Sequence, residues 1–293
     1  MKSCRTAMNL MARMSLLLLA AAPLAGQVIP RAEVVENEVP RAIPVPPAPG
    51  QVPKAEVVED NAAKGPDEDL FSYSTMLYER EEFDLAAKSY TKYLETYPGG
   101  RHAGMALFRI GECLIKQGRE TEAARYYEQV VKGHPKSVGA PSAAYRLGAI
   151  LFNARDFSGS VKYFSFCEQN TVVPRVALAA AYNMSRGYQM LGDSKNQNAA
   201  LQRVVDVKAD NPYRENALLT LAKSELEADR LETALKYFQE LADTAEDAAV
   251  KAEATVNAAV LLGELKQSEK AVALFDAALR MGATSEENKG LAL

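Results

Sequence analysis

The sequence predicts an all-α chain of about six helical hairpins that repeat every 37 residues. Small side chains return at this interval in one column: Ser74, Gly111, Gly148, Ser185, Ala222 and Ala259. Large apolar side chains return in another: Tyr90, Tyr127, Phe164, Leu201, Phe238 and Phe275. Six copies in unbroken register indicate a repeat architecture. The composition agrees with a folded chain, since 48% of the residues are hydrophobic and 25% are charged.

The first 26 residues have the pattern of a secretory signal peptide. Lys2, Arg5 and Arg13 precede an apolar run over residues 14–24. This run is shorter than the roughly 20 apolar residues of a membrane-spanning helix. Gln27 stands where a bacterial lipoprotein carries its lipid-bearing cysteine. We therefore expect a periplasmic or secreted protein without lipid that does not span a membrane after cleavage. An uncleaved N-terminal anchor is the alternative.

Residues 27–66 hold eight of the fourteen prolines, a density that prevents regular structure and predicts a disordered, extended tether. Two near copies lie inside this segment, at residues 31–36 and 54–59. Both contain the sequence Glu-Val-Val-Glu. One interpretation is a spacer enlarged by duplication. The other is a pair of short adhesive strands that add to the sheet edge of a partner.

Each repeat is predicted to contain two helices, because apolar residues in the second repeat follow the helical spacing Leu107, Ile110, Gly111 and Leu114. A turn is expected at residues 117–119, and a second helix should end near Pro135. The small column allows the ring of the second helix to pack closely against the first. The predicted repeats are residues 67–103, 104–140, 141–177, 178–214, 215–251 and 252–288, followed by a tail at 289–293.

This pattern of apolar, small, alanine and aromatic positions over residues 67–288 resembles the tetratricopeptide repeat (TPR). The resemblance implies a solenoid, a right-handed α-α superhelix of hairpins that binds proteins or peptides in a concave groove. The 37-residue step, with junctions such as Tyr97-Pro98-Gly99, is similar to the bacterial cell-envelope subgroup. That subgroup includes Tol–Pal-associated periplasmic TPR proteins and the TPR lipoprotein of outer-membrane β-barrel assembly. A proline-rich segment stands here in place of the coiled coil typical of the former.

The groove face lies one residue, about 100°, round from the core stripe of each first helix. Its expected partner-binding residues are Phe71, Tyr78, Phe108, Ile115, Tyr145, Phe152, Tyr182, Leu219 and Leu226. Aromatic residues in such a strip suit anchoring in a protein interface. Packing against neighbouring helices is the alternative for the first position of each repeat. The second position, which holds Tyr78 and Phe152, is expected to be more exposed.

The last predicted helix offers a second candidate surface, because terminal repeats normally carry a polar outer face. Here that face contains Val272, Phe275 and Leu279. We expect either a partner or a second copy, giving a homodimer through this end, or a tail that folds back over it.

Other classes of function lack the residues they require. A net charge of −4 argues against nucleic-acid binding. No catalytic motif, phosphate-binding loop or metal-ligand spacing is present, so we expect no enzyme activity, cofactor or metal. His102 and His134 are expected to be solvated at helix ends. Cys113 and Cys167 are interpreted as buried free thiols, with a disulfide or thiol switch as the alternative. The predicted function is a non-catalytic periplasmic scaffold or adaptor, or alternatively a structural subunit of an envelope assembly.

Overall fold

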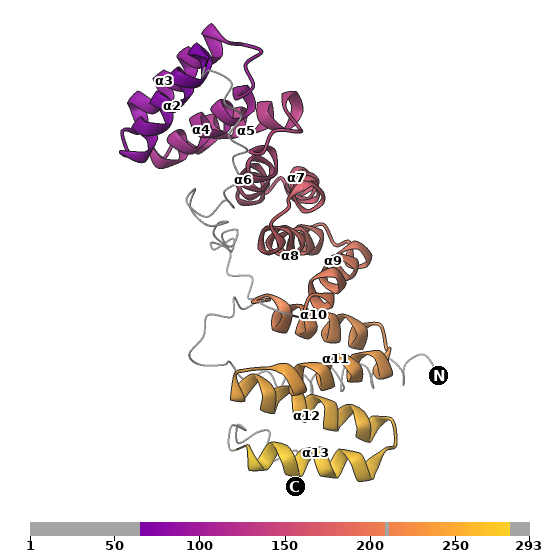
Figure 1. Cartoon of the computed structure of the whole chain (residues 1–293). Helices are drawn as coiled ribbons and strands as arrows, with labels where there is room; N and C mark the ends of the chain where they lie inside the picture. The colour runs from indigo at the N-terminus through magenta and orange to yellow at the C-terminus, as the bar shows by residue number, and fades with distance from the viewer. Residues whose placement is uncertain (1–64, 209–210, 282–293) are drawn as a thin grey trace. The chain divides into compact units, whose positions relative to one another are not determined.

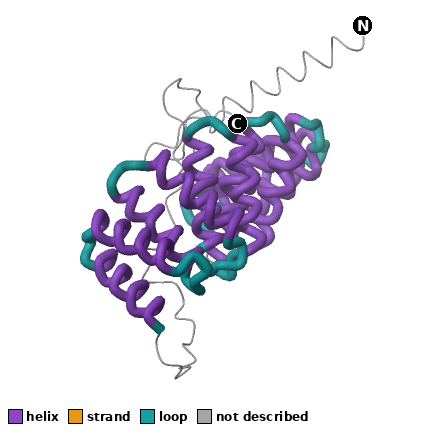
Figure 2. The backbone as a smooth tube through the Cα atoms, turned by 90° about the horizontal axis from the view of Figure 1, so that it is seen from above, coloured by secondary structure: helices purple, strands orange, loops and turns teal. Residues whose placement is uncertain are grey.

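The computed structural model describes residues 65–208 and 211–281, which form helices joined by turns and contain no strand within those ranges (Figures 1 and 2). The predicted all-α repeat fold is confirmed. The helices follow one another as hairpins: α2 (Pro66–Glu79) with α3 (Phe83–Thr96), α4 (Ala103–Lys116) with α5 (Glu120–Gly133), α6 (Ala140–Asn153) with α7 (Phe157–Asn170), α8 (Pro174–Met190) with α9 (Ser194–Asp206), α10 (Arg214–Glu227) with α11 (Leu231–Thr244), and α12 (Ala248–Glu264) with α13 (Ser268–Arg280).

The described residues divide into two compact units, and the division falls within α9 after residue 200. In the first unit, α2 to α8 each pack against the helices adjacent in sequence. In the second unit, α10 to α13 do the same. The predicted signal peptide, most of the predicted tether and the end of the chain lie outside the described residues. Helix α2 already begins at Pro66, the last residue of the predicted tether.

Proline and aspartate define several helix starts. Pro66, Pro141 and Pro174 occupy the first turns of α2, α6 and α8, where a missing N–H breaks no helical hydrogen bond. The carboxylate of Asp156 accepts a hydrogen bond from the Gly159 N–H at the start of α7. These prolines and the capping Asp156 favour a helix start at these points of the repeat.

The turn within every hairpin contains one residue with positive φ, at an interval of 37 residues. These residues are Glu81, Gly118, Arg155, Gly192, Asp229 and Lys266, with φ between 56° and 75°. The left-handed conformation lets the chain reverse after one short turn, and glycine adopts it without steric cost. Four of the six turns place a side chain there and carry that cost, so the repeat geometry prevails over local preference.

Close packing explains the column of small residues. All six members are buried. A Cβ atom added at Gly111 would lie 2.5 Å from Cε1 of Tyr127, and one added at Gly148 would lie 3.0 Å from Cδ1 of Phe164. The rings of Tyr127 and Phe164 have no exposed surface. The absence of a side chain at Gly111 therefore makes room for the ring of the second helix.

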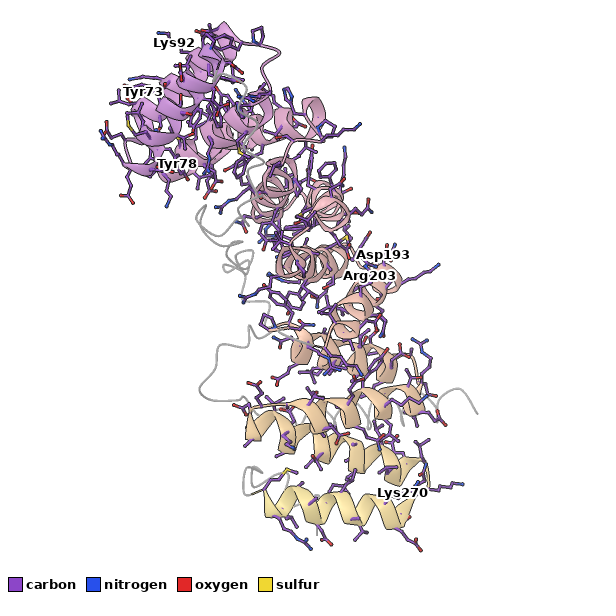
Figure 3. The ribbon with its side chains drawn as sticks, viewed as in Figure 1. Tyr73, Tyr78, Lys92, Asp193, Arg203 and Lys270 are labelled. Atoms are coloured by element: carbon purple, nitrogen blue, oxygen red, sulfur yellow. The ribbon has the colours of Figure 1, made fainter. Side chains whose placement is uncertain are left out.

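Two apolar positions of α2 are more exposed than their equivalents one repeat later, because no helix precedes α2 in the described part of the chain. Tyr73 is 53% exposed and Met76 is 36% exposed, whereas Ile110 and Cys113, one repeat later, are buried. Figure 3 marks Tyr73 and Tyr78 on α2. The two residues thus occupy different environments on one helix.

Candidate functional site

The expected groove residues lie on the first helices of the hairpins but differ in exposure. Phe71, Phe108, Ile115, Tyr182, Leu219 and Leu226 are partly exposed. Tyr78, Tyr145 and Phe152 are buried, with 8%, 2% and 3% of their surface exposed. Leu219 and Leu226 belong to the second unit, and the other seven belong to the first. The first unit therefore carries the aromatic part of the predicted strip.

The expectation that Tyr78 would be more exposed than the first position is wrong. Its ring lies edge-on to Phe83, with centroids 5.5 Å apart, and the guanidinium of Arg109 lies 4.7 Å above it. Arg109 comes from α4, the first helix of the next repeat. Burial, and then the charge of Glu112, raise the pKa of the Tyr78 hydroxyl.

Phe152 is buried by an equivalent arrangement, so the same expectation is wrong there. Its ring lies edge-on to Phe157 at 5.4 Å, and the guanidinium of Arg186 from α8 lies 4.9 Å above it. Burial lowers the pKa of Arg186. Arginine side chains, rather than aromatic rings, thus form the outer layer at both positions.

A buried polar network occupies the centre of the same face. Glu112, which is 5% exposed, accepts a hydrogen bond from the Tyr127 hydroxyl at 2.5 Å and one from Arg146 at 3.0 Å. This network was not expected from the sequence. Glu112 is the one acidic residue of α4, and this was the available signal. Burial, and then the charge of Glu112, raise the pKa of Tyr127.

Tyr145 is held inside by a second polar contact. Asn183 on α8 donates a hydrogen bond to the Tyr145 hydroxyl at 3.0 Å and another to the carbonyl of Ala179 at 3.0 Å. The ring of Tyr145 packs edge-on to Phe164, with centroids 5.4 Å apart. Core packing, the alternative interpretation, describes Tyr145.

His102 is not a solvated helix-end residue, contrary to the expectation from sequence. Its ring stacks on Phe71 at 4.3 Å, and its Nε2 lies 2.8 Å from the carboxylate of Glu68. The pKa of Glu68 is lowered by the hydrogen bond with His102, against burial, which raises it. The contact joins the start of α2 to the junction before α4. Sequence separation concealed it, because Glu68 and His102 are 34 positions apart.

The candidate end face on α13 contains partly exposed apolar side chains. Val272 is 60% exposed, while Phe275 and Leu279 are partly exposed. Residues 282–293, which the tail hypothesis concerns, lie outside the described part of the chain.

Cys113 and Cys167 are buried free thiols, and burial raises the pKa of each to about 12. Across residues 65–208 and 211–281, no group of three or more His, Cys, Asp or Glu side chains could hold a metal ion. None of the helices described is long and apolar enough to cross a membrane.

Models of the tetratricopeptide repeat match two segments of the sequence, residues 105–137 and residues 219–286. The first segment contains α4 and α5, and the second contains most of α10 through α13. These two segments of the chain are therefore similar to tetratricopeptide repeats. No curated protein sequence matches it.

Several solved structures are similar to this chain at low sequence identity. The C-terminal part of a TPR repeat-containing protein from Cytophaga hutchinsonii is 16% identical, with a TM-score of 0.52 over 80% of this chain and 90% of that one. YrrB, described as a TPR protein with an unusual peptide-binding site, is 18% identical, with a TM-score of 0.48 over 70% and 97%. MamA from Desulfovibrio magneticus RS-1 is 18% identical, with a TM-score of 0.45 over 63% and 100%. The similarity to the Cytophaga structure supports the fold of this chain.

Proposed function

We propose that this protein is a non-catalytic scaffold or adaptor that binds another protein or a peptide through the first helices of its TPRs. The observation that carries the proposal is the surface of α4 and α8. Phe108, Ile115 and Tyr182 remain partly exposed there, beside the guanidinium groups of Arg109 and Arg186. Aromatic and arginine side chains dominate the binding energy of protein interfaces.

A photocrosslinking amino acid at position 115 tests this proposal. Ile115 lies at the end of α4 on the proposed face, and Lys92 is an exposed control position on α3 (Figure 3). The full chain is irradiated in its native cells, and the crosslinked products are separated by mass. Defined products from position 115 that are absent from position 92 are expected. Identical products from both positions, or none from position 115, contradict a binding role for this face.

The proposed location is the periplasm of a Gram-negative cell, among envelope proteins. The basic start and short apolar run of residues 1–26 support it. Mass spectrometry of the N-terminus of the mature protein is the direct test. A chain that begins near residue 26 and is released by osmotic shock is expected. A full-length chain in the cytosol would refute the location while leaving the binding proposal standing.

The second candidate function is a structural subunit of an envelope assembly, joined through the end face of Val272, Phe275 and Leu279. The 60% exposure of Val272 favours it, since apolar surface of this kind is a common feature of interfaces. Light scattering during gel filtration of the unaltered chain and the Phe275→Glu variant provides the test. An oligomer that Phe275→Glu dissociates is expected. A monomer in both cases removes this function.

A further inference from the structure

A cavity of about 290 Å³ lies in the second unit, where α12 packs against both α11 and α13 (Figure 1). Apolar side chains form most of its wall: Ala242, Ala258, Leu274, Ala277 and Met281. The expected groove residues of this unit, Leu219 and Leu226, do not line it. The cavity is therefore separate from the face proposed to bind a protein or peptide.

One repeat earlier, a buried arginine fills the equivalent place. Arg214 is 8% exposed. Its guanidinium donates hydrogen bonds to the carbonyl of Val205 at 3.2 Å and to the hydroxyl of Thr244 at 3.0 Å. It also pairs with the carboxylate of Glu240. These partners come from α9 and α11, so Arg214 closes the gap between the two helices on either side of α10.

The last repeat lacks this arrangement, and the cavity is the space that remains. The residues 37 positions after Arg214 and its two side-chain partners all line the cavity: Lys251, Ala277 and Met281. Alanine at position 277 supplies no carboxylate. Within the described part of the chain, the ammonium group of Lys251 forms no ion pair or hydrogen bond. Lys251 thus lacks the anion with which Arg214 is paired.

A phenol ring is replaced in the same place. The hydroxyl of Tyr237 donates a hydrogen bond to the side-chain oxygen of Gln202 at 2.7 Å. The residues 37 positions later are Leu274 and Gln239, which both line the cavity. Leucine is smaller than tyrosine and has no donor for the amide oxygen of Gln239. Compared with the repeat before it, this part of the chain therefore lacks both a phenol ring and a carboxylate.

From these differences we propose that the cavity binds a small aromatic carboxylic acid. The carboxylate pairs with Lys251, and a hydroxyl on the ring donates to Gln239. A cavity of roughly 150 Å³ already holds benzene, so about 290 Å³ leaves room for a substituted ring. Hydrogen bonds between an ammonium group and a carboxylate are stronger than those between neutral groups, which favours the acid over neutral analogues. This binding activity is additional to the proposed scaffold function and does not depend on it.

One acidic side chain, Asp243, also lines the cavity. Its equivalent one repeat earlier, Asp206, accepts a hydrogen bond from Gln202 at 2.9 Å. That repeat also holds the ion pair of Arg214 and Glu240. An aspartate at this position is therefore compatible with a second carboxylate close by. Its repulsion of a bound acid predicts that Asp243→Asn strengthens binding.

Isothermal titration calorimetry of the full chain with two matched probes tests the proposal. The probes are para-hydroxyphenylacetate and its neutral amide, para-hydroxyphenylacetamide. The acid should bind about tenfold more tightly, because only the acid forms a charge-assisted bond with Lys251. Phenylacetate, which has no hydroxyl for Gln239, should bind more weakly than the para-hydroxy acid. Equal affinity for the acid and the amide, or no heat of binding from either, overturns the proposal.

Substitutions then locate the site. Lys251→Gln should weaken binding of the acid about tenfold and leave the amide unaffected. Ala277→Glu should supply the carboxylate that Glu240 supplies one repeat earlier, and so raise the melting temperature and abolish binding. Ala273→Glu is the matched control, since Ala273 is an exposed residue of α13 that does not line the cavity.

Unchanged binding of the acid in Lys251→Gln or in Ala277→Glu overturns the assignment, as does an equal loss in the control. If Ala277→Glu unfolds the chain, Lys251→Gln still decides, because Lys251 is partly exposed and has no partner to lose among the described residues. Weaker binding in Asp243→Asn would contradict the place given to the carboxylate.

Two other partners of Lys251 are separated by the same titration. Binding that appears only in Asp243→Asn would show that Asp243 neutralises Lys251 in solution. Binding that appears only after Glu286 and Glu287 are replaced by Gln would show that the chain's own carboxylates occupy the cavity. Either result overturns the proposal of a separate ligand.

Discussion

Replacing Gly111 with alanine tests the packing on which the repeat fold depends. The new Cβ would lie 2.5 Å from Cε1 of Tyr127, with two more ring carbons at 2.9 Å. Contacts this short require the ring to move. The ring has no exposed surface, and its hydroxyl is held by Glu112 at 2.5 Å, so a shift disturbs the buried network as well.

The expected magnitude follows from two opposing effects. Overpacking of a closely packed core costs about 1–3 kcal/mol, and a contact as short as 2.5 Å places this substitution in the upper part of that range, at about 2–3 kcal/mol. Alanine gains about 1 kcal/mol over glycine in a helix interior. The net loss in the free energy of unfolding should be about 1–2 kcal/mol, which lowers the melting temperature by about 2–8 °C for a unit of this size.

Circular dichroism during thermal and urea unfolding of the full chain measures this loss. Gly133→Ala is the matched control, because Gly133 is the last residue of α5 and a Cβ there meets nothing within 4 Å. The control should leave the melting temperature unchanged or raise it. A Gly111→Ala protein that melts at or above the unaltered chain would refute the steric explanation of the small column.

Three further predictions concern the turns, the first junction and the thiols. Arg155→Gly should raise the free energy of unfolding by about 0.5–1 kcal/mol in urea denaturation, since glycine relieves the positive φ of 63°; an unchanged midpoint argues against strain at that turn. The lowered pKa of Glu68 stabilises the folded chain, fully above the unfolded pKa of 4.5, and this stabilisation is lost as the pH falls through the folded pKa. Glu68→Gln should therefore weaken the dependence of the melting temperature on pH between pH 5 and 3. An unaltered pH profile would contradict this prediction. With the third cysteine, Cys4, replaced, Cys113 and Cys167 should resist a thiol reagent at pH 8 until urea unfolds the chain, because burial raises both pKa values to about 12. Rapid labelling of the native protein would count against this.

The packing of the repeats could be predicted from sequence because it depends on volume at a fixed interval. Each member of the small column faces the same neighbour in its own hairpin, so the requirement is repeated and appears as a period. The column of positive φ was harder to find. Only Gly118 and Gly192 carry the residue that the turn favours, and Glu81, Arg155, Asp229 and Lys266 show no common type.

Exposure within the candidate site could not be predicted, because it depends on side chains from the next repeat. Helical spacing placed Tyr78 and Phe152 on the expected groove face of the first helices. It gave no indication that Arg109 and Arg186 would fold over their rings. A long arginine side chain covers apolar surface while keeping its charge outward. The helix face on which a side chain lies therefore follows from the repeat, whereas its burial depends on which residue occupies the adjoining helix.

Two adjacent positions of each first helix show how one fold separates stability from recognition. Residues 74, 111, 148 and 185 are Ser, Gly, Gly and Ser, all buried against the paired helix. The next residues, at 75, 112, 149 and 186, are Thr, Glu, Ala and Arg. A rotation of about 100° moves a position from the interior of the hairpin to the predicted groove face. Because only the first set must fit beside a ring, the second set varies in charge from repeat to repeat. The charge pattern of the face can therefore differ between proteins that share the same packing, which is why the fold alone does not identify a partner.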